Sequence, residues 1–217
     1  MLYIDIHTHD QAALDDVLKV VNIFPWDEVK INTGPGLFYS AGIHPWYIDE
    51  MDIEVNLKKI RDWHVAGKII AIGEAGLDTL CGAEMRKQKE VFIEQISISE
   101  ESGCPMIIHC VKAYNEILSM RKASKAKQPW ILHGFNSSVQ MMRQMTDTGI
   151  FISLGPVLMR NKKLQQVCRE LPDEKLFFET DVSGIDVKDV YLKAAGIRDV
   201  PIKALKETVA GNFNRLF

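Results

Sequence analysis

Seven residues that can bind metals or transfer protons come directly after short apolar runs in this 217-residue chain. They are His7, His9, His44, Glu74, His109, His133 and Asp181. Neutral imidazole nitrogens and carboxylate oxygens are donors suited to divalent transition metals. If the apolar runs are strands of one parallel sheet, their carboxyl ends converge on one face. The pattern therefore predicts a metal site on that face.

His7 and His9 stand two residues apart at the end of the first apolar run. On a strand, both side chains point to the same side and can grip one cation through their neutral rings. A chance pair of partly exposed histidines is the alternative interpretation of any His-x-His motif. Because five of the six histidines follow apolar runs, we favour chelation.

Glu74 follows small and apolar residues, where an unpaired carboxylate is costly to bury. A salt bridge to Lys or Arg is the alternative, but no basic residue is adjacent in the sequence. We therefore expect Glu74 to be a carboxylate that bridges metal ions.

His109 and His133 each end an apolar run. Either residue alone would more often be a hydrogen-bonded core histidine, but together they offer a second pair of nitrogen donors. Asp181 is either a metal ligand or the N-cap of a following turn. His64, which we place in the middle of a helix, receives no chemical role.

Asp78 and Glu179 are further carboxylates close to these positions. They can hydrogen-bond the ligating groups from behind, which fixes ligand orientation at metal sites. Capping a helix or pairing on the surface are equally open interpretations.

Eight apolar, β-branched runs predict strands at residues 2–6, 17–24, 37–43, 68–74, 105–109, 130–133, 150–154 and 176–179. Apolar residues three or four apart predict helices at residues 85–102, 113–126, 139–148 and 162–171. Strands that alternate with helices favour a parallel sheet. An open doubly wound sheet would carry a glycine-rich loop after its first strand, where this chain has His7-Thr8-His9. We therefore predict an α/β fold, a TIM-type (β/α) barrel.

The front of this barrel must be short, because such barrels usually need about 250 residues. Between the first and third strands there is room for one short helix, near residues 11–16. Residues 32–36 (Asn-Thr-Gly-Pro-Gly) predict a turn. We expect abbreviated N-terminal crossovers and a single hydrolase domain over residues 1–217.

The bulk composition excludes several classes of protein. A net charge of −3 gives no field for a stable nucleic-acid-binding module, although brief contact by an enzyme remains open. The four cysteines form no C-x-x-C pair, which argues against a zinc finger or a disulfide framework. With no basic leader and no run near 18 apolar residues, we expect a cytoplasmic protein with reduced thiols and no membrane contact. No obligate protein partner is evident.

The motifs, taken as an ordered set, resemble the TatD family of metal-dependent deoxyribonucleases, within the amidohydrolase-like superfamily. The resemblance is carried by residues 5–9 (Asp-Ile-His-Thr-His), 42–45 (Gly-Ile-His-Pro), 72–78 (Ile-Gly-Glu-Ala-Gly-Leu-Asp), 88–95, 108–109, 132–135 (Leu-His-Gly-Phe), 179–181 (Glu-Thr-Asp) and 212–217. It implies two divalent ions about 4 Å apart that activate a water. One ion is held by His7, His9, Glu74 and Asp181, and the other by Glu74, His109 and His133. Asp181 is then the candidate to position the water or accept its proton.

The resemblance also suggests which residues contact substrate, and the chain departs from the family there. His44 is expected to contact a substrate phosphate. Where the family commonly has Arg, this chain has Val111 with Lys112 beside it, so Lys112 is a second candidate contact. Residues 133–137 (His-Gly-Phe-Asn-Ser) replace His-Cys-Phe-Ser-Gly, and Ser183 replaces a proline. These changes leave the metal set intact and alter the substrate-facing loops.

Three hypotheses follow from the sequence. The first is a phosphodiester hydrolase, a deoxyribonuclease or exonuclease that trims DNA or RNA ends. The second is a small-molecule amidohydrolase that uses the same metals on an amide, lactone or cyclic imide. The third is a metal-binding protein without turnover. Mixed His and carboxylate ligands suit zinc, manganese, iron or nickel, with magnesium less natural.

Overall fold

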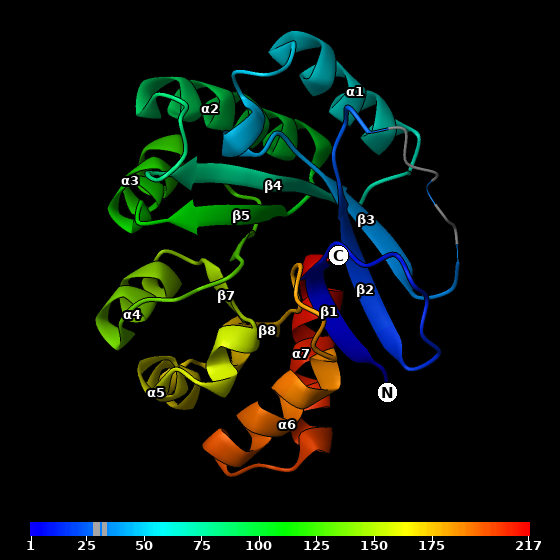
Figure 1. Cartoon of the computed structure of the whole chain (residues 1–217), viewed down its shortest axis with the longest axis vertical. Coiled ribbons are helices and arrows are strands. Elements are labelled where there is room, and N and C mark those ends of the chain that lie inside the picture. The colour runs from blue at the N-terminus through cyan, green and yellow to red at the C-terminus, as the bar shows by residue number, and fades with distance from the viewer. Residues whose placement is uncertain (28–30, 32–33) are drawn as a thin grey trace.

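Eight parallel strands form the core of the protein in chain order, as the computed structural model shows for residues 1–27, 31 and 34–217 (Figure 1). The strands are β1 Tyr3–Thr8, β2 Val17–Ile23, β3 Leu37–Ala41, β4 Ala71–Asp78, β5 Met106–Val111, β6 Trp130–Leu132, β7 Phe151–Leu154 and β8 Leu176–Phe178. The last strand returns to the first, where Thr8 and Asp181 form a parallel bridge. The sheet is therefore a nearly closed barrel, and the predicted TIM-type fold is confirmed.

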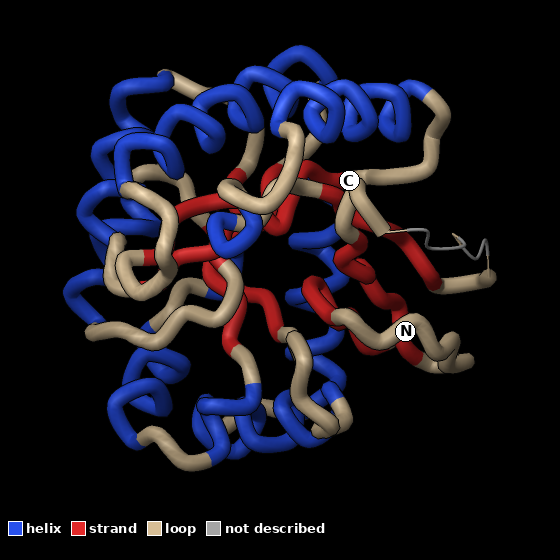
Figure 2. Tube along the Cα trace, turned by 45° about the horizontal axis from the view of Figure 1, so that its top comes forward, coloured by secondary structure: helices blue, strands red, loops and turns tan. Residues whose placement is uncertain are grey.

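Helices cover most of the outside of this barrel (Figure 2). They are α1 Ile53–Val65, α2 Met85–Ser102, α3 Tyr114–Ser124, α4 Val139–Asp147, α5 Lys162–Glu170, α6 Val187–Arg198 and α7 Ile202–Leu216, with 3-10 turns η1 Pro45–Tyr47, η2 Pro156–Met159 and η3 Asp173–Lys175. The bounds of α2 to α5 agree with the sequence prediction to within two residues.

The first two crossovers contain no helix among the residues that the structure describes. Their expected abbreviation is confirmed, but the short helix predicted near residues 11–16 is wrong. Side chains hydrogen-bond the backbone of this segment at Ala12. Asp10 accepts from the Ala12 amide at 3.0 Å, and Lys19 Nζ donates to the Ala12 carbonyl at 2.9 Å. Such local bonds compete with the helical pattern.

The turn predicted at residues 32–36 is described only in part. Pro35 and Gly36 form a turn directly before β3, whereas residues 32 and 33 lie outside the described residues. Gly36 has a φ of +77°, a backbone conformation that glycine adopts without strain.

Strands β1, β4 and β5 run past the positions at which the sequence prediction ended them. Backbone pairing between β4 and β5 continues beyond the site, with Gly76 opposite His109 and Asp78 opposite Val111. Gly76 has a φ of +152°, and a Cβ atom there would lie 2.0 Å from the His109 carbonyl oxygen. Glu74 and His109 therefore project from within their strands rather than from the strand ends.

Two glutamines of α2 hydrogen-bond the backbone at the ends of β3 and β4, next to site residues. Gln95 Oε1 accepts from the Ile43 amide at 2.7 Å, and its Nε2 donates to the Ile43 carbonyl at 3.1 Å. One heptad earlier, Gln88 bonds the amide and carbonyl of Asp78 at 2.8 and 3.0 Å. Both side chains are buried, so α2 satisfies backbone groups that have no strand partner.

The seam between β8 and β1 is held largely by side chains. The buried Asp5 carboxylate accepts from the Thr180 amide at 3.0 Å and from its hydroxyl at 2.6 Å. Burial raises the pKa of Asp5 to about 7, against the lowering effect of the Thr180 bonds. Lower in the barrel, the Tyr191 hydroxyl donates to the Ile4 carbonyl at 3.1 Å and accepts from its amide at 3.2 Å.

Three further expectations can be compared with the structure. Among the described residues, no helix is both long and apolar enough to cross a membrane. All four cysteines are described, and none forms a disulfide. His64 lies in the last turn of α1 rather than in the middle of a helix, and its Nδ1 is 3.2 Å from the Cys104 sulfur.

Replacing Gln95 by alanine is expected to destabilise the fold, because it leaves the Ile43 amide and carbonyl buried without partners. At about 1–3 kcal/mol for each such group, the free energy of unfolding should fall by roughly 2–6 kcal/mol. Urea unfolding measures this change. Glu94→Ala, one position away on the exposed face of α2, is the matched control and should change stability by less than about 0.5 kcal/mol. Equal stability of the two variants would contradict a stabilising role for the Gln95 bonds to the Ile43 backbone.

Candidate metal centre

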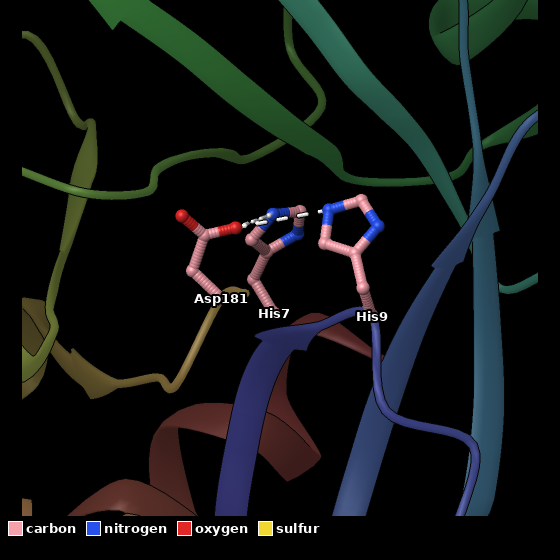
Figure 3. A group of neighbouring side chains, drawn as sticks. All are labelled: His7, His9 and Asp181. Carbon is pink, nitrogen blue, oxygen red and sulfur yellow. Dashed lines mark ion pairs between the residues drawn. The ribbon is translucent and has the colours of Figure 1, made fainter. Parts of the chain in front are cut away.

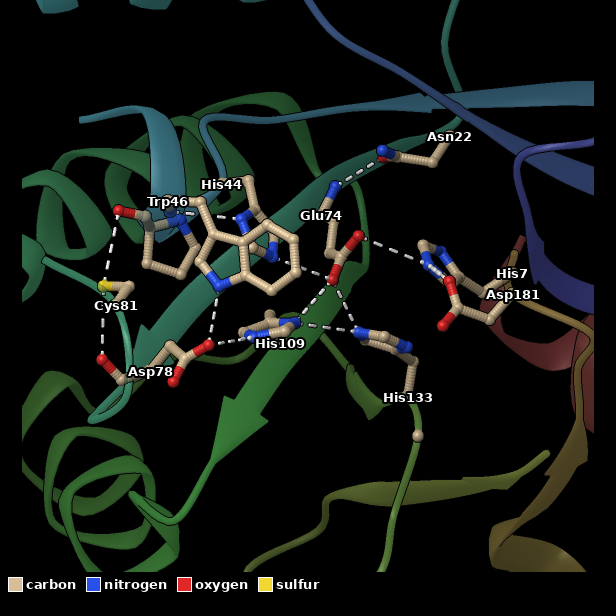
Figure 4. A network of polar contacts seen from close by, with 12 residues as sticks. His7, Asn22, His44, Trp46, Glu74, Asp78, Cys81, His109, His133 and Asp181 are labelled. Atoms are coloured by element: carbon tan, nitrogen blue, oxygen red, sulfur yellow. Dashed lines mark hydrogen bonds and ion pairs between the residues drawn. The ribbon is translucent and has the colours of Figure 1, made fainter. Parts of the chain in front are cut away.

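Glu74 lies at the centre of the site, and its two carboxylate oxygens face different sets of histidines (Figure 4). Oε2 is 3.4 Å from His7 Nε2 and 3.7 Å from His9 Nε2. Oε1 is 2.6 Å from His109 Nδ1 and 2.7 Å from His133 Nε2. One carboxylate therefore connects two groups of imidazoles across the barrel mouth.

Asp181 completes the first group (Figure 3). Its Oδ1 is 3.5 Å from His7 Nε2 and 3.7 Å from His9 Nε2. The Asp181 amide donates to the His7 carbonyl, and its carbonyl accepts from the His9 amide, so barrel closure fixes its place. It does not cap the following helix, because Asp186 is the N-cap of α6.

Two outer carboxylates lie behind the second group, one within hydrogen-bond distance of His109 and the other within ion-pair distance of His133. Asp78 Oδ2 is 3.4 Å from His109 Nε2, and Glu179 Oε1 is 3.5 Å from His133 Nδ1. The ring nitrogens that face Glu74 are thereby the opposite ones, Nδ1 of His109 and Nε2 of His133. A carboxylate behind an imidazole fixes its orientation and raises its basicity as a ligand.

His44 joins the cluster in a different protonation state. Its Nδ1 accepts from the Trp46 amide at 3.1 Å, so this nitrogen carries no hydrogen. Burial lowers the pKa of His44, although Glu74 opposes this effect. The neutral ring therefore carries its hydrogen on Nε2, which lies 3.3 Å from Glu74 Oε1. His44 is close enough to Glu74 and His109 for a shared ion, but this tautomer makes it a hydrogen-bond donor.

The cluster attracts positive charge. Burial disfavours ionisation of Glu74, but His133 and His7 hold the pKa of Glu74 well below its usual value. Burial and His133 disfavour protonation of His7, yet Glu74 and Asp181 raise the pKa of His7 to about 9. The pKa of His133 is also raised well above its usual value, because Glu74 and Glu179 outweigh burial. Protons on the imidazoles or bound cations can supply this charge.

The donor set fits a metal ion. Nε2 of the fully buried His7 makes no close hydrogen bond but lies 3.4 Å from Glu74 Oε2 and 3.5 Å from Asp181 Oδ1, an arrangement that a cation held among these three atoms would satisfy. Ligand atoms lie within 4.8 Å of one another in three groups: His7, His9 and Asp181; His7, Glu74 and His133; His44, Glu74 and His109. These buried His and Glu clusters indicate a metal site.

The structure brings seven of the eight predicted site residues together and leaves Lys112 apart. Lys112 is exposed after β5, and its side chain makes no hydrogen bond or ion pair with any described residue. Sequence reasoning missed Asn22, whose Oδ1 accepts from the Glu74 amide at 2.7 Å. An uncharged polar residue near the end of a largely apolar strand was the available signal for Asn22.

Comparisons with known proteins place the chain in a family. The sequence profile of the TatD related DNases matches residues 27–217. YabD of Bacillus subtilis, an uncharacterized metal-dependent hydrolase, is 29% identical over 199 residues, which cover 83% of this chain and 77% of that protein. The 3'-5' ssDNA/RNA exonuclease TatD of Citrobacter koseri is 28% identical over 172 residues, which cover 75% of this chain and 64% of that protein.

A solved structure agrees in fold. YJJV, a TatD homologue from Escherichia coli K12, superimposes with a TM-score of 0.88 at 20% identity, over 99% of this chain and 97% of that one. Because the family profile matches most of the chain and the barrel carries buried His and Glu clusters at its mouth, this protein belongs to the TatD-related family of metal-dependent hydrolases.

Proposed function

We propose that this protein binds two divalent ions and hydrolyses phosphodiester bonds at the ends of single-stranded DNA or RNA. The observation that carries the proposal is Glu74, whose two oxygens face two separate sets of donors. The similarity to an exonuclease from Citrobacter koseri supports phosphodiesters as the substrate class.

The ligand sets follow from the two sides of Glu74. We assign His7, His9, Asp181 and Glu74 Oε2 to one ion. His109, His133 and Glu74 Oε1 would hold the other. This mixture of nitrogen and oxygen donors suits zinc, manganese, iron or nickel better than magnesium.

Two bound ions supply Lewis-acid chemistry, which activates a water and stabilises charge on the phosphate. Asp181 is the candidate base, because its side chain is 39% exposed and can meet solvent and substrate. Burial opposes its ionisation, but His7 holds the pKa of Asp181 below its usual value. Asp181 is therefore ionised at neutral pH and can accept a proton from water.

Two residues are assigned to phosphates of the substrate. The Nε2 hydrogen of neutral His44 points into the cluster and can donate to a phosphate oxygen. Lys112 is exposed directly after β5, and we assign it to a phosphate of the bound strand away from the metal centre.

Replacing Glu74 by glutamine is expected to abolish two-metal loading, because the amide keeps the size of the side chain and removes its charge. Cleavage of single-stranded DNA should fall by about 100-fold or more. Elemental analysis and a gel assay on the same preparations measure both effects. The control is Glu94→Gln on the exposed face of α2, which should retain metals and activity. Full metal content in Glu74→Gln would refute the bridging assignment.

Metal binding is expected to release protons at pH 7, since His7 and His133 have raised pKa values in the metal-free protein. A protonated ring must lose its proton to become a ligand. Apparent affinity should therefore rise with pH up to at least the His7 pKa of about 9. Calorimetric titration in buffers of different ionisation enthalpy counts the protons. Binding without proton release would place the ions elsewhere.

End trimming is expected on single strands labelled at one end. A strand labelled at its 3′ end should release labelled mononucleotide first if the polarity matches that of the Citrobacter relative, whereas a 5′ label should stay on a shortening ladder. If the metal-loaded protein leaves both strands intact but hydrolyses small amides, lactones or cyclic imides, the phosphodiesterase proposal fails and the amidohydrolase alternative replaces it.

A further inference from the structure

Four aromatic side chains lie around one edge of the metal centre, three of them in mutual contact and the fourth packed on His44 and His109, and we call them the aromatic rim. They are Phe24 and Trp26, which follow β2, and Trp46 and Tyr47 in η1. The rings of Phe24 and Trp26 stack with centroids 4.8 Å apart and planes at 11°. Tyr47 packs on both, at 5.3 and 5.1 Å.

The aromatic rim runs along the catalytic histidines. Phe24 lies 5.8 Å from the ring of His9, and Tyr47 lies 6.0 Å from the ring of His44. At the other end, Trp46 packs edge-on against His44, with ring centroids 4.9 Å apart. Trp46 is also 6.3 Å from His109, which belongs to the second group of imidazoles. A substrate bound at the centre therefore meets aromatic rings on this side.

Trp46 is both exposed and fixed. Its residue surface is 56% exposed, an unusual position for the largest apolar side chain. The indole Nε1 donates to Asp78 Oδ2 at 2.7 Å, and Asp78 also accepts from the Leu80 amide at 2.7 Å (Figure 4). The ring is thus held in one orientation beside the site without being buried, as a preformed binding platform requires.

We propose that the aromatic rim, with Trp46 as its main platform, stacks the nucleobases next to the scissile phosphate. This inference rests on the phosphodiesterase function proposed above. Every base has a flat face, so stacking holds single strands without reading their sequence. Bases within a duplex keep their faces covered, so the aromatic rim selects unpaired ends.

The charge of the protein favours the same conclusion. The net charge is −3, so the protein has no overall field that attracts a polyanion, and Lys87 is paired with Asp49, which follows η1. A strand that gains little from Lys and Arg along its backbone must gain affinity from its bases. The aromatic rim provides that surface beside the centre that binds the phosphate.

The test compares Trp46→Leu with wild type in the metal-loaded protein, on two single strands. One strand has normal bases, and the other carries abasic sites at its two terminal nucleotides. We expect Trp46→Leu to raise KM about ten-fold or more on the normal strand, because stacking contributes to binding. On the abasic strand the variant and wild type should have equal KM values. Trp46→Phe should recover most of the affinity. Leu and Phe both remove the bond to Asp78, so a difference in KM between Trp46→Leu and Trp46→Phe reports the ring alone.

Trp63→Leu is the matched control, because Trp63 lies on α1 against Lys59, away from the site. It should leave KM unchanged on both strands. An equal effect of Trp46→Leu on normal and abasic strands, or no effect on either, would overturn the stacking proposal while leaving the phosphodiesterase intact. If wild type cleaves neither strand, the proposed function fails, and fluorescence anisotropy with phosphorothioate-linked strands decides the inference. Weaker binding by Trp46→Leu to the normal strand alone supports it, and equal binding overturns it.

Discussion

The buried carboxylate of Glu74 is the constraint on which the site depends. A carboxylate taken out of water needs positive charge nearby, and here four imidazoles provide it or hold the cations that do. Its position is fixed from behind, because Asn22 accepts from the Glu74 amide and from the Ser40 hydroxyl. The barrel thus brings histidines that lie in or directly after β1, β5 and β6 close to Glu74 of β4.

The segment that closes the barrel also supplies a residue of the site. The β8 strand has three residues, and the chain then pairs with β1 through the Thr8–Asp181 bridge. Asp181 closes the sheet with its backbone and faces His7 and His9 with its side chain. The Asp5–Thr180 bonds below support that closure. An opening of this seam would remove a carboxylate from the centre, so stability and metal binding are coupled.

The sequence predicted the ring of site residues because barrel geometry gathers the ends of all the strands on one face. It did not predict that β4 continues to Asp78, because the polar Glu74 interrupts the apolar run, whereas backbone pairing continues through polar positions. The helix expected near residues 11–16 failed because Asp10 and Lys19 bind its backbone. The bonds of Gln95 to Ile43 and of Trp46 to Asp78 join segments distant in sequence. Periodic patterns report local structure only, so they could not predict these contacts.

Anomalous diffraction from crystals of the manganese- or zinc-loaded protein is the most direct test of the bridging role of Glu74. Two peaks about 3.5–4 Å apart are expected, one beside Oε2 with His7 and His9, the other beside Oε1 with His109 and His133. A single peak, or a pair of peaks that leaves Glu74 uncoordinated, would contradict the two-metal centre.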